Sequence, residues 1–77
     1  MNIDLNKIKK VHFIGIGGIG ISAIARMMLL QGKKVTGSDR SQSIVTDLLV
    51  GLGALFFFEH NEKNLSDDTD LVVYTIA

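Results

Sequence analysis

A cluster of glycines near the start of the chain is the pattern with the clearest chemical meaning. Gly15, Gly17 and Gly20 fill the three places of a G-x-G-x-x-G motif within residues 12–22. In such a motif the first glycine makes a tight turn, the second lets the backbone approach a diphosphate, and the third lets a helix pack closely on a strand. The start of that helix adds free N–H groups and the positive end of its dipole. The motif therefore predicts a site for the phosphates of a nucleotide, whose identity it does not specify.

Polar residues beside the glycines extend this prediction beyond phosphate. Asp39 ends the next expected strand, about twenty residues after the motif, where a carboxylate can accept hydrogen bonds from ribose hydroxyls, as in NAD sites, or from another nucleoside donor. A helix-capping role without a ligand is the alternative for Asp39, and Ser38 could assist it at a ligand. Ser22 follows the glycines in the first turn of the helix, where its hydroxyl could bind a phosphate oxygen or bond to the backbone.

The two histidines differ in their expected roles. His12 lies inside the first expected strand and is predicted to be a hydrogen-bonded core residue. His60 lies in a loop between Glu59 and Glu62 at the expected ligand edge, where it could act as a base or contact a ribose. Two histidines this far apart do not make a metal site, so no metal is expected.

The composition excludes several classes of function. Eight basic and eight acidic residues give zero net charge, which predicts neither nucleic-acid nor membrane binding. The chain has no cysteine, no G-x-x-x-x-G-K-[ST] loop for ATP, and no activated nucleophile or paired acid and base, so no catalytic residue is expected. Short apolar stretches and the absence of a signal-peptide pattern favour a cytoplasmic location.

Alternating strands and helices must position these residues. Strands are expected at residues 10–16, 34–39, 54–58 and 70–75. Helices are expected from about residue 18 to 31, ended by Gly32, and from a cap at Ser41 or Ser43 to Gly53. The second helix is expected to face the sheet with Ile44, Leu48, Leu49 and Leu52. The polar stretch 60–69 is expected to hold at most a short helix.

Strands separated by helices run parallel, so the chain is predicted to form an α/β, Rossmann-like doubly wound sheet with strand order 3-2-1-4. Ligands bind such sheets at the carboxyl ends of the strands. That edge is expected to collect residues 15–22, 38–40, 60–61 and 75–77. Because the sequence stops directly after the last expected strand, we expect a sheet that is incomplete at its C-terminus and belongs to a longer protein.

Several segments together resemble the start of the Mur ligases, the amide-forming ligases of peptidoglycan biosynthesis. The resemblance covers nearly the whole chain after the first few residues. The doubled glycine Gly17-Gly18 and the strand ending Gly37-Ser38-Asp39 make it far more specific than the glycine motif alone. It also includes Gln31-Gly32, Leu52-Gly53-Ala54 and the run from Asp70 to Ala77.

The resemblance implies that residues 1–77 are the N-terminal, UDP-sugar-binding domain of a three-domain ligase. The glycine loop would hold the diphosphate of UDP-N-acetylmuramate, with Ser38 and Asp39 on the uridine side and residues 75–77 on the opposite wall of the cleft. The implied substrate-binding residues are Gly15, Gly17, Gly18, Ile19, Gly20, Ser22, Ser38, Asp39, His60, Thr75 and Ala77.

In the family, ATP and Mg²⁺ convert the muramate carboxylate to an acyl phosphate, which the amine of L-alanine attacks. The resemblance places the ATP site in a central domain and the amino-acid site in a C-terminal domain. Both lie outside these residues, so the implied partners are a nucleotide sugar and the other ligase domains in cis. The chain by itself is expected to bind neither ATP nor Mg²⁺ and to have no ligase activity.

Three alternatives to this function remain open. A sister ligase that attaches a tripeptide to the same nucleotide sugar shares much of the glycine loop. The coenzyme domain of an NAD-dependent oxidoreductase is the interpretation that Asp39 alone would favour, and only the family resemblance reverses it. A ligand-sensing module without chemistry would use the same fold.

Overall fold

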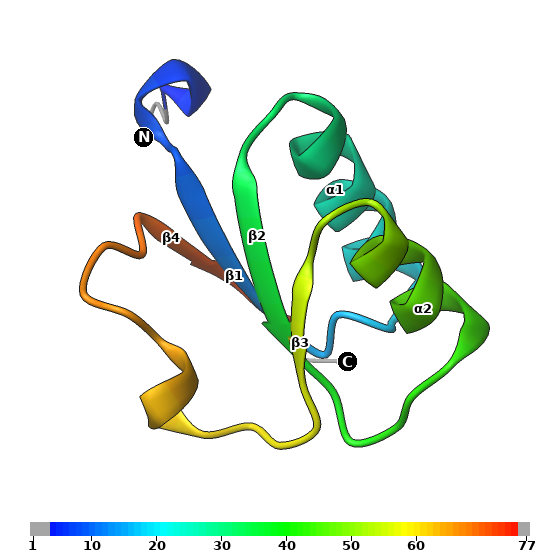
Figure 1. The fold of residues 1–77 in the computed structure, drawn as a ribbon. Coiled ribbons are helices and arrows are strands. Elements are labelled where there is room, and N and C mark those ends of the chain that lie inside the picture. The colour runs from blue at the N-terminus through cyan, green and yellow to red at the C-terminus, as the bar shows by residue number, and fades with distance from the viewer. Residues whose placement is uncertain (1–3, 76–77) are drawn as a thin grey trace.

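The computed structural model describes residues 4–75 and shows a four-stranded parallel sheet with strand order β3-β2-β1-β4 (Figure 1). The strands are β1 (Lys10–Ile14), β2 (Lys34–Ser38), β3 (Leu55–Phe57) and β4 (Leu71–Val73). The helices are α1 (Ile19–Leu30) and α2 (Ile44–Gly51), with short 3-10 helices η1 (Leu5–Lys7) and η2 (Glu62–Asn64). The predicted α/β fold and strand order are confirmed, and each strand is one to three residues shorter than expected.

Local signals explain where the two helices stop and start. Gly32 follows α1 with φ of +82°, a left-handed conformation that side chains disfavour. Of the two predicted caps for α2, Ser43 is the one used: its hydroxyl accepts a hydrogen bond from the backbone N–H of Thr46 at 3.2 Å. The Thr46 hydroxyl in turn accepts one from the Ser43 N–H at 2.8 Å, which completes a capping box.

Both helices lie on the same face of the sheet, and the core lies between them and the strands (Figure 1). The core consists of Val11, Phe13, Ile16, Ile21, Ala25, Met28, Val35, Leu49 and Ala54. The prediction of which α2 residues face the sheet is wrong in part. Only Leu49 of the four predicted residues is buried, while Ile44 is 79% exposed and Leu48 is 65% exposed. The buried positions of this short helix are Thr46 and Leu49, three residues apart on one side.

The opposite face of the sheet carries the alternate side chains of the strands. His12 of β1 and Thr36 of β2 are paired in the register and both are buried on this face. In Figure 1 the connection between β3 and β4, which includes η2, loops out on the side away from the helices. A doubly wound sheet has α-helices on both faces, and among residues 4–75 only one face has α-helices.

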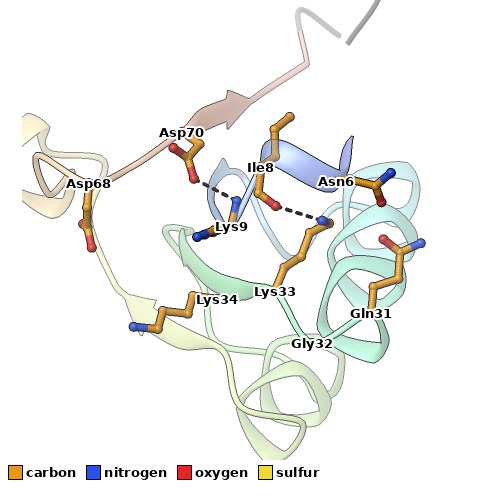
Figure 2. A pocket seen from close by; sticks show the side chains of 9 residues that line it. All are labelled: Asn6, Ile8, Lys9, Gln31, Gly32, Lys33, Lys34, Asp68 and Asp70. Carbon is orange, nitrogen blue, oxygen red and sulfur yellow. Dashed lines mark hydrogen bonds between the residues drawn. The ribbon is translucent and has the colours of Figure 1, made fainter. Parts of the chain in front are cut away.

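Backbone and side-chain bonds close the amino-terminal edge of the sheet. The carboxylate of Asp70 accepts hydrogen bonds from the backbone N–H groups of Lys9 and Lys10, at 2.8 and 3.0 Å. The Lys33 ammonium donates to the carbonyl of Ile8 at 2.8 Å. Figure 2 shows Asp70 bonded to Lys9, and Lys33 bonded to Ile8, around a hollow of about 620 Å³. The hollow lies at the end of the sheet opposite the expected ligand edge, so it is not the candidate site.

Candidate nucleotide-binding site

The glycine loop leaves β1 through a turn at Gly15, whose φ is +79°. The N–H groups of Gly15 and Ile16 both donate to the carbonyl of Ser38, at 2.8 and 3.0 Å, and the N–H of Gly18 donates to the carbonyl of Gly15 at 2.9 Å. The tight turn predicted for the first glycine of the motif is confirmed. These bonds fix the loop against the carboxyl end of β2 and leave none of the three N–H groups free for a ligand.

Gly17 is required by its protein neighbours. A Cβ at this position would lie 2.9 Å from Oδ2 of Asp39 and 3.1 Å from Cγ2 of Thr46. The backbone N–H of Gly17 donates to the same Asp39 oxygen at 2.9 Å. The second glycine therefore lets the carboxylate and the start of α2 approach the loop, which is a role separate from the predicted close approach of a diphosphate.

The role predicted for the third glycine of the motif is wrong. A Cβ on Gly20 would meet no atom within 4 Å, so this residue does not allow close packing of α1 on a strand. The close contact is at Gly37 in β2, where a Cβ would overlap Cδ1 of Ile16 and lie 2.7 Å from its Cβ. In the sequence, Gly37 stood out only as part of the family pattern. Its contact with Ile16 could not be predicted, because it depends on where the loop folds back over β2.

The start of α1 supplies the free donors of the site. Gly18 is the N-cap residue and no side chain caps it, so the N–H groups of residues 19–21 have no acceptor within the helix. Ile19 is 93% exposed at this point. The hydroxyl of Ser22 donates to the carbonyl of Ile19 at 3.0 Å, which confirms the backbone-bonded alternative for that serine. Contact between Ser22 and a phosphate stays a prediction that requires this bond to open.

Hydrogen bonds of Asp39 connect the glycine loop, the segment after β2 and the end of β3. Besides the Gly17 bond, its Oδ1 accepts a long hydrogen bond of 3.4 Å from the N–H of Ser41, and its own N–H donates to the carbonyl of Phe57 at 3.0 Å. It is half-buried, so part of the carboxylate faces solvent. Residues 11–25 contain no lysine or arginine. Within the loop itself, positive potential therefore comes from backbone N–H groups, and the basic residue beside Asp39 in the sequence is Arg40.

Ser38 and His60 form a second polar group on the opposite face of the sheet. Ser38 is fully buried, and its hydroxyl shares a hydrogen bond of 2.6 Å with Nδ1 of His60. A cavity of about 290 Å³ lies beside this pair, lined by His12, Ile14, Ser38, His60, Asn61, Glu62 and Leu65. The expected site is thus divided between the two faces. Contact of Ser38 or His60 with a uridine stays a prediction.

His12 has the core role predicted for it. It is 2% exposed, and its Nδ1 and the hydroxyl oxygen of Thr36 lie 2.7 Å apart in a hydrogen bond. Burial lowers the pKa of the imidazole below the ordinary value of 6.5, and the nearby His60 and Lys10 lower it further. His12 is therefore a neutral structural residue near pH 7.

The remaining predicted residues lie past the last strand. Thr75 is exposed and lies two residues beyond the end of β4, and Ala77 lies outside the described residues. No group of three or more His, Cys, Asp or Glu side chains within residues 4–75 could hold a metal ion. In the same part of the chain, neither helix is long and apolar enough to cross a bilayer.

Comparison with known proteins decides the family. A family model described as "Mur ligase family, catalytic domain" matches residues 10–77. The chain belongs to the Mur ligase family. This Mur ligase chain is 49% identical over 78 residues to UDP-N-acetylmuramate--L-alanine ligase of Clostridium tetani (strain Massachusetts / E88), covering 100% of this chain and 17% of that protein. Identity to the ligase of the same name from Clostridium novyi (strain NT) is 55% over 69 residues, which is 90% of this chain and 15% of that protein.

A solved structure agrees with the Mur ligase assignment. The crystal structure of UDP-N-acetylmuramate-alanine ligase MurC from Thermotoga maritima matches with a TM-score of 0.80 and 43% sequence identity. The match covers 88% of this Mur ligase chain and 16% of that chain. The predicted resemblance and fold are confirmed. The chain spans 15–17% of the length of the curated relatives described above.

Proposed function

We propose that this chain is the part of a peptidoglycan ligase that binds UDP-N-acetylmuramate, and that the whole protein adds L-alanine to the muramate carboxylate. The uncapped start of α1 carries this proposal, because it presents free N–H groups of residues 19–21 next to the turn at Gly15. Relatives that are 49% and 55% identical are named for this ligation, which supports L-alanine over a tripeptide as the added group.

A diphosphate fits the donors that the loop offers. The helix start combines several N–H groups with the positive end of the helix dipole, and together they bind anions without a basic side chain. The exposed backbone around Ile19 gives a diphosphate access to them. Asp39 lies at the adjacent end of β2, where its carboxylate can accept a hydrogen bond from the nucleoside that the diphosphate carries.

ATP and Mg²⁺ are proposed to bind parts of the ligase other than this chain. The described residues 4–75 include no cluster suited to a metal ion, and the sequence contains no phosphate-binding loop of the G-x-x-x-x-G-K-[ST] type. Binding and orientation of the nucleotide sugar is therefore the step assigned to these residues. The chain alone is expected to lack ligase activity, and the remaining ligase domains, in a cytoplasmic enzyme, are its proposed partners.

Asp39 also favours a second candidate, the coenzyme domain of an NAD-dependent oxidoreductase. A carboxylate at the end of the second strand is the usual acceptor for the ribose hydroxyls of NAD. Both UDP-N-acetylmuramate and NAD would place a diphosphate at α1, but only the first carries uridine. The two functions therefore differ in which ligand these residues should bind.

Amide chemical shifts of the isotope-labelled chain, followed during titration with UDP-N-acetylmuramate, UDP or NADH, test the proposal. We expect both uridine ligands to move the amide signals of residues 18–21 and Asp39, with UDP-N-acetylmuramate effective at the lowest concentration. Shifts at these positions with NADH, and none with the uridine ligands, would overturn the ligase proposal in favour of the oxidoreductase.

A further inference from the structure

Thr46 connects the start of α2 to the glycine loop. It is 1% exposed and is the third residue of the helix. Its methyl carbon Cγ2 would lie 3.1 Å from a Cβ on Gly17, so the methyl group fills the space beside the Gly17 backbone. Gly17 directly precedes Gly18, the N-cap residue of α1. The contact therefore reaches the loop just before the helix start that carries the free N–H groups.

The hydroxyl of Thr46 is bonded within α2 and its cap. It accepts a hydrogen bond from the N–H of Ser43 at 2.8 Å and donates one to the carbonyl of Ser43 at 3.0 Å. The hydroxyl and the methyl of a threonine turn together about one torsion angle, so bonds that fix the hydroxyl also fix the direction of the methyl. The capping box of α2 thus points the methyl at Gly17, and the contact that Thr46 makes with the loop is apolar.

The middle of the glycine loop depends on this contact more than its start does. The start is tied to β2 by two backbone bonds to the Ser38 carbonyl. Gly17 is tied to the segment after β2 by one hydrogen bond, from its N–H to Oδ2 of Asp39 at 2.9 Å. A single hydrogen bond tolerates a range of angles, so it leaves the loop able to rotate about it. The Thr46 methyl adds a second contact, from another element, that restricts this rotation.

We propose that Thr46 is a positioning residue of the ligand site. Its methyl group holds Gly17, and through Gly17 the start of α1, in the orientation that binds a diphosphate. The residue acts through the loop and is assigned no contact with the ligand. This inference rests on the proposed nucleotide site at α1, and it gives α2 a part in binding although the free donors belong to α1.

Two variants of Thr46 separate the methyl from the hydroxyl. Thr46→Ser keeps the hydroxyl and its bonds to Ser43 and removes the methyl, whereas Thr46→Val keeps the branched shape and removes the hydroxyl. The matched control is Thr36→Ser, the same change at a second buried threonine. Thr36 is 7% exposed on the other face of the sheet, and its hydroxyl keeps the hydrogen bond with His12 in the control.

Amide hydrogen exchange of the 77-residue chain without ligand measures how the loop is held. The readout is the ratio of the exchange rates of the Gly17 and Ile16 amides, because a general loss of stability speeds both rates and leaves their ratio unchanged. We expect Thr46→Ser to raise this ratio about fivefold, since it removes one buried methyl from the loop contact. Thr46→Val and Thr36→Ser should keep the ratio within about twofold of the parent.

Calorimetric titration with UDP-N-acetylmuramate tests whether this orientation matters for binding. We expect Thr46→Ser to weaken binding about fivefold, and Thr46→Val and Thr36→Ser to stay within about twofold of the parent. The inference is overturned if Thr46→Ser changes neither or only one of the exchange ratio and the affinity, or if either other variant has the same effects. A Thr46→Ser chain that is unfolded by circular dichroism also overturns it, because the methyl would then support the whole domain.

Failure of the proposed function gives a different result. A parent chain that binds NADH and not UDP-N-acetylmuramate contradicts the ligase proposal. The variants are then compared with NADH, which also carries a diphosphate, and the exchange ratio still reports whether Thr46 holds Gly17. A parent chain that binds UDP-N-acetylmuramate, together with unchanged affinity in Thr46→Ser, contradicts the role of Thr46 alone. A parent chain that binds neither ligand contradicts both.

Discussion

Ile16 occupies the space that a side chain on Gly37 would need. A Cβ on residue 37 would overlap Cδ1 of Ile16 and lie 2.7 Å from its Cβ, and Ile16 itself is 1% exposed. The glycine loop can therefore fold back onto β2 only because β2 has a glycine at this position. The contact links the strand whose end carries Asp39 to the loop that leads into α1.

Gly37→Ala should consequently destabilise the domain. The added methyl group meets the branch point of a buried side chain, which cannot rotate away, and overpacking of this kind costs about 1–3 kcal/mol in the free energy of unfolding. Urea denaturation followed by circular dichroism measures the change. Gly51→Ala is the control, because a Cβ there meets nothing within 4 Å and alanine favours the helix. If the two variants prove equally stable, the contact does not constrain the loop.

Acid should destabilise the domain through His12. Burial lowers its pKa below 6.5 in the folded chain, so the unfolded chain binds more protons once the pH falls below about 6.5. The free energy of unfolding should be constant from pH 8 to 7 as far as this group is concerned. It should fall between about pH 6.5 and the folded pKa, and level off below that value.

Two measurements check the behaviour of His12. The C2–H proton signal of its imidazole should titrate with a midpoint below 6.5, and urea denaturation should show lower stability at pH 5.5 than at pH 7.5. A midpoint at or above 6.5 would mean that the buried Thr36 hydrogen bond and the surrounding strands do not disfavour the imidazolium form.

Ser43 should stabilise α2 through its capping box. Replacement of such a cap by alanine typically costs about 1 kcal/mol, so Ser43→Ala should lower the free energy of unfolding by that amount. Ser41→Ala removes the other serine considered for this cap and should change stability by less than about 0.5 kcal/mol. A larger loss of stability in Ser41→Ala than in Ser43→Ala would show that Ser41, and not Ser43, caps α2.

Local patterns were sufficient to predict the fold. Apolar runs separated by Gly32 and Gly53 mark the strands and helices, and helices between strands require a parallel sheet. The face of α2 was harder to predict, because the helix is apolar around most of its circumference. Periodicity then does not distinguish Leu49, which is buried, from Leu48, which is 65% exposed.

The candidate site was predicted less well, because its contacts join residues far apart in the sequence. The motif marked the glycines, but not that the Gly17 N–H is bonded to Asp39, 22 residues later. Nor does strand alternation by itself show that the Ser38 hydroxyl is bonded to His60 on the other face of the sheet. Each of these contacts depends on how loops fold at the carboxyl edge, which sequence spacing alone does not determine.

The central claim is that the start of α1 binds the diphosphate of UDP-N-acetylmuramate, and a charge placed there tests it most directly. Ile19 and Ile44 are the first residues of α1 and α2 and are 93% and 79% exposed. Aspartate at the start of a helix is compatible with folding, because its negative charge interacts favourably with the positive end of the helix dipole. Ile19→Asp and Ile44→Asp are therefore the same chemical change at two helix starts, one inside the proposed site and one outside it.

Calorimetric titration of the parent and both variants with UDP-N-acetylmuramate is the decisive measurement. We predict that Ile19→Asp weakens binding by at least about tenfold through repulsion of the diphosphate, while Ile44→Asp stays within about twofold of the parent. Equal affinity for the parent and Ile19→Asp, in chains shown to be folded by circular dichroism, would contradict a diphosphate site at the start of α1.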